Sequence, residues 1–247
     1  MTEQTGVWLY AVTRERDGWD GLAGVADAAV RPIAGAGLVA LGSTVDLASY
    51  GEAALKRNLE DLDWLAATAR AHDQVVRAAA QRGVTVPLRL ATVYRNDDRV
   101  RAMLDESGAE FEETLHRFEG RAEWGVKGYV EATPRPTLPA PTSGTDYLHR
   151  RRAQLAKGNH AGQDALRVHE TLSSLAVAAR KHPLQDARLT GISAQMVLNS
   201  TYLVDDERVA EFHRLVTEQG NAGIRLDLTG PWPPYSFSRN DFREALQ

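Results

Sequence analysis

The clearest hydrophobic pattern lies near the end of the chain, where apolar and polar residues alternate one by one over Ile224–Leu228. A strand places alternate side chains on opposite faces, so its isoleucine and leucines share one face, while Arg225 and Asp227 share the other. Gly230 and Pro231 follow, and proline ends strands because it fixes its own φ and cannot donate a ladder hydrogen bond. The pattern predicts a half-buried strand that closes a domain.

Alternation also predicts strands over Glu123–Glu131 and Ala194–Val204, and a weaker apolar run predicts one over Leu184–Thr190. Two helical patterns lie between the strands, one over residues 145–181 with a bend near residue 158, and one capped by Asp205 or Asp206. The order from residue 123 is strand, helix, strand, strand, helix, strand. This is the split βαβ, or ferredoxin-like, arrangement, with both helices on one face of an antiparallel sheet.

The first half of the chain has a looser α+β pattern. Val7–Val12 is nearly all apolar, which is typical of a strand covered on both faces. The glycine-punctuated stretch Ile33–Leu47 predicts a hairpin, and Tyr50–Arg82 shows a helical period throughout. Val84–Tyr94 is strand-like, and Pro87 within it favours an edge position. Further helices are predicted over Trp19–Val30, Asn96–Leu104 and Ala109–Phe118.

These patterns predict an α+β protein of two domains, the second of them ferredoxin-like. We place the first domain at residues 1–121 and the second at 122–234, with a Pro-rich loop over 133–144 inside it. Residues 235–247 form a C-terminal arm. A chain of 247 residues with 43% hydrophobic content can build a core for each domain.

Charge and residue usage narrow the function classes. Lys+Arg 29 against Asp+Glu 33 gives a formal net charge of -4, so the chain does not have the field that gathers nucleic acid or anionic lipid. The absence of cysteine removes disulfides, thiolate nucleophiles and cysteine-ligated zinc. We find neither a signal-peptide pattern nor an apolar stretch long enough for a bilayer, and we expect a soluble cytoplasmic protein without a lipid-membrane or nucleic-acid partner.

A search for catalytic and metal-binding spacings finds none of the common motifs. His149, His160 and His169 do not form the HExxH spacing that places two imidazoles on one helix face. No serine lies in a G-x-S-x-G context, and no glycine-rich loop matches a phosphate-binding or dinucleotide fingerprint. His72 beside Asp73 has the composition of an oriented base, but a packing or surface pair is the favoured interpretation.

Two other segments have the composition of contact surfaces. Arg150–Arg152 is a basic run, but acidic neighbours and the net charge favour a solvated helix face over a nucleic-acid patch. Trp232, Tyr235 and Phe237 follow the last strand on a proline-stiffened segment. They form either an interaction arm or a cap on their own sheet, and the sequence leaves both open.

Several segments carry, in order, a resemblance to a known family. They are VWLYAV at the start, the helix-into-strand segment LEDLDWLAATARAHDQVVRAAAQRGVTVPLRLATVY, then EWGVKGYV, and LTGPWPPYSF at the end. The chain from about Val7 to Phe237 resembles the gas vesicle protein F and L family. Its Ala- and Arg-rich style is similar to that of actinobacterial members.

The resemblance implies an α+β first domain and a modified ferredoxin-like second domain, in agreement with the pattern. It also implies an accessory or minor structural role in gas vesicle assembly. Such a protein would bind the small hydrophobic shell protein, help to nucleate or extend the shell, and have other gas vesicle accessory proteins as partners. The family carries no enzymatic activity, so the resemblance implies no catalytic residue, cofactor or metal.

We take candidate partner-binding residues from the matching segments. An exposed sheet edge or an aromatic arm could hold a shell subunit that would otherwise aggregate through its apolar face. The candidates are Pro87, Leu88, Arg89, Tyr94, Trp232, Pro233, Pro234 and Tyr235.

Two other function classes stay open at this point. Two ferredoxin-like units in one chain of this length also describe the haem-binding chlorite dismutase group, in which His169 or His160 would be the iron ligand. An RNA-binding module would show affinity that falls steeply with salt, and the acidic balance of the chain disfavours it.

Overall fold

The computed structural model describes residues 4–15, 17–130, 161–185, 194–220 and 224–238. The chain divides into two compact units, Met1–Gly120 together with Trp232–Gln247, and Arg121–Pro231. The final segment therefore groups with the first unit, whereas the sequence suggested a second domain reaching residue 234 and a separate arm. The Pro-rich loop 133–144, the basic run 150–152 and the histidines at 149 and 160 lie outside the described residues.

The first unit is built on a five-stranded sheet in the order β2-β3-β1-β4, with β5 also paired to β1. All its pairings are antiparallel. β1 is buried from its second residue to its last, which confirms the prediction of a strand covered on both faces. β4 ends the sheet order, so Pro87 lies in an edge strand as predicted. The bounds are β1 Thr5–Thr13, β2 Arg31–Gly35, β3 Leu38–Asp46, β4 Thr85–Pro87 and β5 Val93–Tyr94.

The predicted hairpin is formed by β2 and β3, which pair from Gly35 opposite Leu38. Only two residues connect the strands, Ala36 and Gly37, and both have positive φ, at 50° and 79°. A turn of this kind matches the right-handed twist of the strands, and glycine adopts such a backbone without a side-chain clash.

The single helix predicted over 50–82 is wrong in its continuity. The structure has two helices there, α2 Glu52–Asn58 and α3 Leu62–Ala80, and a short helix α1 Leu47–Tyr50 ends where the predicted one begins. Gly51 is extended, with φ -75° and ψ 168°, and separates α1 from α2. Asp61 starts α3, because its side chain accepts hydrogen bonds from the backbone N–H groups of Asp63 and Trp64. A strong cap therefore overrides the apolar period that runs through this segment.

Two other helix predictions for the first unit differ from the structure. Trp19–Val30 forms only the short 3-10 turn η1 Val25–Asp27, because Ala26 and Asp27 have positive φ and cannot continue a right-handed helix. The two helices predicted over 96–104 and 109–118 are one helix, α4 Asp97–Phe118. Gly108 lies inside α4, where a Cβ atom would come within 3.3 Å of Ala36 Cβ in the hairpin turn.

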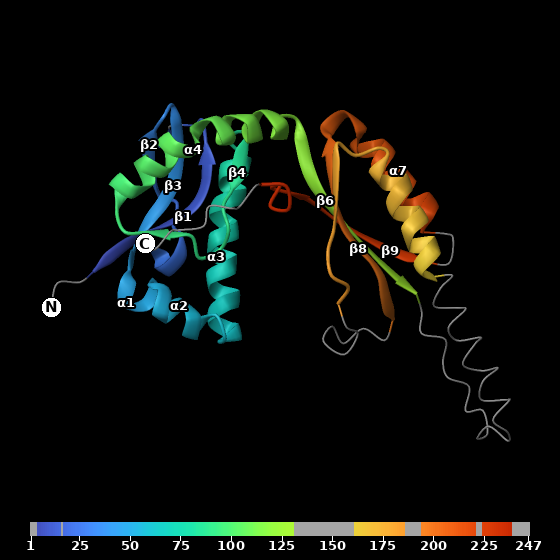
Figure 1. Ribbon diagram of the computed structural model, residues 1–247, viewed down its shortest axis with the longest axis horizontal. Coiled ribbons are helices and arrows are strands. Elements are labelled where there is room, and N and C mark those ends of the chain that lie inside the picture. Colours follow the sequence, from blue (N-terminus) through green and yellow to red (C-terminus); the bar gives the residue numbers. More distant parts are fainter. Residues whose placement is uncertain (1–3, 16, 131–160, 186–193, 221–223, 239–247) are drawn as a thin grey trace, which may run out of the picture. The chain divides into compact units, whose positions relative to one another are not determined.

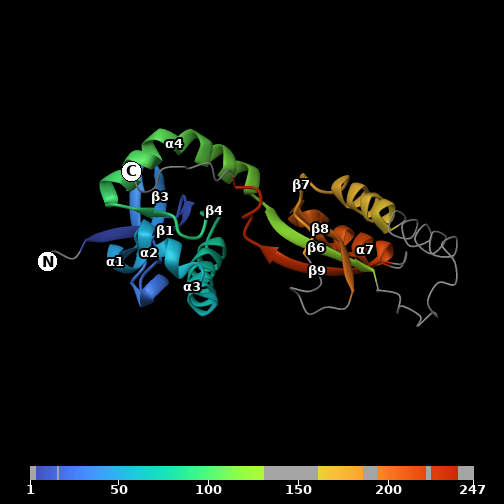
Figure 2. The ribbon, with the colours of Figure 1, turned by 60° about the horizontal axis from the view of Figure 1, so that its bottom comes forward.

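Helices cover both faces of this first sheet. Figure 2 shows α4 on one side of the strands and α1 to α3 on the other. The hydrophobic cluster that includes Val75, Val76 and Ala79 of α3 joins them to Trp8 and Tyr10 of β1. Burial of β1 on both faces follows from this arrangement.

The second unit contains a four-stranded sheet in the order β7-β8-β6-β9. Its chain order is β6, a helix over residues 161–173, β7, β8, α7 and β9, which confirms the predicted ferredoxin-like arrangement. The second strand is β7 and not the predicted Leu184–Thr190, whose first two residues are in no strand and whose residues 186–190 lie outside the described ranges. Both helices contribute to one hydrophobic cluster with the sheet, through Leu172 on one and Phe212 on the other. The bounds are β6 Arg121–Val130, β7 Ala178–Lys181, β8 Gln195–Asp205, η2 Asp206–Arg208, α7 Val209–Gln219 and β9 Arg225–Trp232 (Figure 1).

Two boundaries in the second unit differ from the predictions. The helix predicted to reach Lys181 ends at residue 173, and Ala178–Lys181 is already strand β7. Pairing with β8, in which Ala178 lies opposite Leu203, overrides the helical propensity of this Ala-rich stretch. β9 continues past Pro231 to Trp232, because an edge strand tolerates a residue without an N–H.

Candidate functional site

The centre of the candidate site is α3, whose buried face carries His72. The indole N–H of Trp8 donates to His72 Nδ1 over 3.1 Å, and His72 Nε2 lies 3.1 Å from the carbonyl oxygen of Leu88. Because an indole nitrogen can only donate, Nδ1 of His72 must accept. Nε2 therefore carries the hydrogen and donates it in a hydrogen bond to the Leu88 carbonyl oxygen. Burial lowers the pKa of His72 from 6.5 to about 4, so the ring is neutral near pH 7.

His72 therefore has a packing role, as the sequence analysis favoured. The ring is 3% exposed, and both of its nitrogens are occupied by groups of the protein itself. It ties α3 to the central strand β1 and to the turn that follows β4. An oriented general base would need a ring nitrogen that faces a substrate.

The outer flank of α3 holds the C-terminal segment. The hydroxyl of Tyr235 donates to Asp73 Oδ1 over 3.4 Å, and the guanidinium carbon of Arg77 lies 4.4 Å from the ring centre of Trp232. Asp73 and Arg77 also form an i,i+4 ion pair at 2.5 Å. The aromatic residues predicted as an arm thus fold back onto the first unit, where Trp232 and Tyr235 each contact a charged side chain of α3.

The turn between β4 and β5 lies on the other side of His72. The Leu88 N–H donates to Tyr10 O, and the Thr92 side chain and N–H both donate to Arg89 O. Arg89 itself is exposed at the tip of this turn. Leu90, Ala91 and Tyr235 all pack against one hydrophobic cluster, so the turn and the arm both contribute to the core of the first unit.

The structure brings the two groups of candidate residues to neighbouring positions of one helix. Leu88 is bonded to His72, and Tyr235 is bonded to Asp73, the next residue along α3. Most of the candidates are nevertheless buried in the first unit. The buried ones are Pro87, Leu88, Tyr94, Pro233 and Pro234, whereas Arg89 is exposed, and Trp232 and Tyr235 are half-buried.

The exposed and half-buried polar and aromatic side chains that α3, the turn and the arm contribute include Asp73, Arg77, Arg89, Trp232 and Tyr235. We call these five residues the α3 strip. Two of its members, Asp73 and Arg77, were not among the residues singled out from the sequence as partner contacts. Their i,i+4 spacing and opposite charges were a visible signal of an exposed helix face. Nothing local to that helix indicates that the chain end returns to it.

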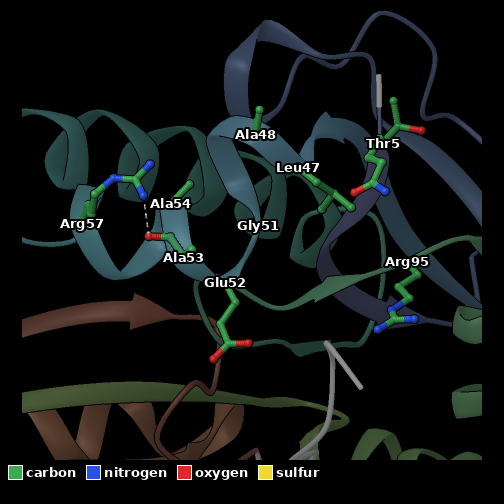
Figure 3. A pocket seen from close by; sticks show the side chains of 10 residues that line it. Thr5, Leu47, Ala48, Gly51, Glu52, Ala53, Ala54, Arg57 and Arg95 are labelled. Carbon is green, nitrogen blue, oxygen red and sulfur yellow. Dashed lines mark hydrogen bonds between the residues drawn. The ribbon is translucent and has the colours of Figure 1, made fainter. Parts of the chain in front are cut away.

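A hollow of about 700 Å³ lies elsewhere in the first unit, between the start of β1 and the helices α1 and α2 (Figure 3). Arg57 and Arg95 contribute its basic side chains. Arg57 is bonded to the Ala53 carbonyl, as the dashed line in Figure 3 marks, and Glu52 forms an i,i+4 ion pair with Lys56. Among the described residues that line the hollow there is no histidine, serine or cysteine.

In the second unit, His169 is the described histidine that the haem alternative would use. Its Nδ1 lies 2.9 Å from the Tyr202 hydroxyl, and its Nε2 lies 3.5 Å from Ser173 Oγ. Both ring nitrogens therefore have partners within the protein. Burial, followed by the charge of Lys181, lowers the pKa of His169. Within the described ranges, no cluster of three or more acidic or histidine side chains is placed to hold a metal ion.

Comparison with solved structures places this fold in a defined class. The crystal structure of gas vesicle protein GvpF from Anabaena sp. PCC7120 superposes with a TM-score of 0.69 at 19% identity, covering 95% of this chain and 98% of that chain. GvpF from Microcystis aeruginosa gives a TM-score of 0.66 at 17% identity, covering 95% and 99%. At these identities the likeness concerns the fold alone: the two-unit α+β architecture is that of gas vesicle proteins.

Sequence comparison then gives the family. The family model described as gas vesicle synthesis protein GvpL/GvpF matches residues 6–239. Gas vesicle protein L of Streptomyces sp. strain CB03234 is 43% identical over 244 residues, which cover 94% of this chain and 92% of that protein. The chain therefore belongs to the GvpL/GvpF family, as its sequence segments indicated, and has a role connected with gas vesicles. None of the helices in the described ranges is both long and apolar enough to cross a membrane.

Proposed function

We propose that this protein is an accessory or minor structural component of gas vesicle assembly, which binds the small hydrophobic shell protein and helps to nucleate or extend the shell. The observation that carries the proposal is the family match over residues 6–239, together with 43% identity to a protein named gas vesicle protein L. Other gas vesicle accessory proteins are its further partners, and it acts in the cytoplasm, at the gas vesicle.

We assign shell-protein binding to the α3 strip. Trp232 and Tyr235 are half-buried, so each residue stays partly accessible while a contact with α3 holds its side chain. Aromatic and arginine side chains held in place in this way supply much of the energy in protein interfaces, because little side-chain entropy is lost on binding. Arg77 is such an arginine, because it lies over the Trp232 ring and pairs with Asp73, and Arg89 adds an exposed positive charge.

The physical need for such a surface follows from the partner. A shell subunit with a water-repelling face would aggregate before it reached the growing shell. A partner that covers this face for a time would prevent aggregation, and interfaces of small area are typical of transient contacts. The net charge of -4 keeps the complex soluble.

The proposed role is one of binding and not of catalysis. It needs no cofactor, metal or nucleic acid. The haem-binding alternative would require a ring nitrogen of a histidine for iron, and His169 uses both of its nitrogens within the protein. No specific observation favours that alternative.

The test is capture of purified shell protein by the full chain. Trp232→Ala removes an aromatic ring of the strip, and Arg89→Glu reverses its exposed charge at the turn. Both should lower recovery, by roughly fivefold or more if each is an interface anchor. Leu166→Ala is the matched control, because Leu166 is an exposed apolar residue of the second unit, at 48%, outside the strip.

Circular dichroism of each variant separates loss of binding from loss of folding. Capture of shell protein by the wild type, reduced by Trp232→Ala and unchanged by Leu166→Ala, supports the strip. Equal recovery by all variants would show that the strip is not the contact, and no capture by the wild type would remove shell-protein binding itself.

A further inference from the structure

β9 is an edge strand with one unpaired side. It ends the order β7-β8-β6-β9, and no described strand pairs with its outer side (Figure 2). It runs antiparallel to β6, because Arg225 lies over the ring of Tyr129, whereas Thr229 lies beside Gly125. Such an edge presents a row of backbone N–H and C=O groups to which another strand can be added.

The two faces of β9 have different characters. Leu226 and Leu228 are half-buried and pack against the cluster formed by the sheet and its helices. Beside them is a hollow of about 730 Å³, whose lining comes from β6, α7 and β9. On the other face, the side chains of Arg225 and Asp227 form an ion pair at 2.8 Å and remain 56% and 41% exposed. Both are therefore accessible to a neighbouring strand.

The sequence of this edge is complementary to itself. From Ile224 to Leu228 it reads apolar, positive, apolar, negative, apolar. If two copies run antiparallel about a two-fold axis through Leu226, positions equally far from Leu226 face each other. Arg225 of the first copy then faces Asp227 of the second, and Asp227 of the first faces Arg225 of the second. The apolar residues likewise meet only apolar residues.

We propose that β9 pairs in this antiparallel manner with β9 of a second copy of this chain, which joins the two four-stranded sheets edge to edge. The two ion pairs across the junction select this register, since a shift by two residues would bring like or unpaired charges together. Charged side chains on an edge commonly discourage pairing with unrelated strands. In β9 the positive Arg225 and the negative Asp227 lie two positions apart, so they also attract the same two residues of an antiparallel second copy.

The paired stretch is short. Pro231 has no N–H to donate, so it limits ladder bonds at one end. The dimer should therefore be reversible, and its population should rise with protein concentration. This association uses residues 224–228 of the second unit, none of which belongs to the α3 strip.

The test is the molar mass of the full chain in solution, measured by sedimentation over about a hundredfold range of concentration. Asp227→Arg gives a chain with two positive positions on β9, and Arg225→Asp gives one with two negative positions. Each alone should weaken self-association at least about tenfold, because like charges then face each other. An equimolar mixture of the two variants should recover the dimer, since every positive position again faces a negative one.

Arg214→Asp is the control, because Arg214 is an exposed residue of α7, 63% accessible, whose ion pair with Glu218 lies outside β9. It should dimerise as the wild type does. A wild type that stays monomeric throughout overturns the proposal. So does a dimer that both charge reversals leave intact, or one that they abolish without recovery on mixing. Circular dichroism of the variants confirms that each is folded.

Discussion

The buried bond network of His72 gives the sharpest test of the first unit's architecture. Replacing His72 by phenylalanine keeps a planar ring of similar size but removes both ring nitrogens. The Trp8 N–H and the Leu88 carbonyl, each bonded to His72 over 3.1 Å, then lose their partners. Both sites are dry, since Trp8 is 0% exposed and Leu88 2% exposed.

The expected cost follows from these two groups. A buried donor or acceptor left without a partner costs about 1–3 kcal/mol, so His72→Phe should lower the free energy of unfolding by about 2–6 kcal/mol. Trp8→Phe in the same background removes the orphaned N–H. The double variant should therefore lose less stability than the sum of the single variants, with a coupling energy on the order of 1–2 kcal/mol.

The same residue predicts a dependence of stability on pH. The pKa of His72 is about 4 in the folded protein and 6.5 ordinarily, so the unfolded chain binds the proton more readily. The contribution of the neutral His72 ring to the free energy of unfolding is therefore fully present above pH 6.5 and is lost as the pH falls toward 4. The shift corresponds to about 3 kcal/mol, and the His72→Phe variant should lack it.

Urea unfolding of the full chain, followed by circular dichroism at pH 7 and at several lower values, measures both effects. His169 and His182 also have a pKa lowered by burial, so the informative quantity is the difference between wild type and variant. A His72→Phe loss below about 1 kcal/mol, strictly additive single and double variants, or identical pH profiles would each refute the network.

Two further substitutions test the packing of the first sheet. Gly24→Ala would place a Cβ atom 2.1 Å from the Tyr10 hydroxyl and should lower the melting temperature by several degrees, whereas Gly162→Ala, with nothing within 4 Å, should leave it nearly unchanged. Equal melting temperatures for these two variants would contradict the close approach. Tyr10→Phe removes the hydroxyl that accepts the Val25 N–H and bonds Ser43, and should cost about 1–3 kcal/mol in the same urea assay. A cost near zero would show that water replaces the hydroxyl.

The strands of this protein were predictable because their alternation is a local signal. Ile224–Leu228 and Glu123–Glu131 alternate cleanly in the sequence. Residues 225–228 of the first lie in β9 and residues 123–130 of the second lie in β6, in the sheet whose order confirms the ferredoxin-like prediction. The helices were harder to predict, because an apolar period does not show where a helix is interrupted. Asp61 caps α3 in the middle of such a period, and the positive φ of Ala26 prevents a helix where the residues favour one.

In the candidate site, too, local sequence patterns predicted some features, whereas contacts between distant residues could not be predicted. Sequence segments identified the edge strand with Pro87 and the aromatic residues of the arm. The contact between Tyr235 and Asp73 joins residues 162 positions apart, and no local pattern predicts it. Burial of Pro87, Leu88, Pro233 and Pro234 also follows from tertiary packing, which leaves Arg89, Trp232 and Tyr235 as the accessible candidates.

The most direct test of the central claim is electron microscopy of cells whose gene for this protein has been deleted and then restored. The proposed role in assembly predicts that the deletion strain lacks gas vesicles or makes few and small ones, and that the wild-type gene restores them. Normal gas vesicles in normal number in the deletion strain would contradict it.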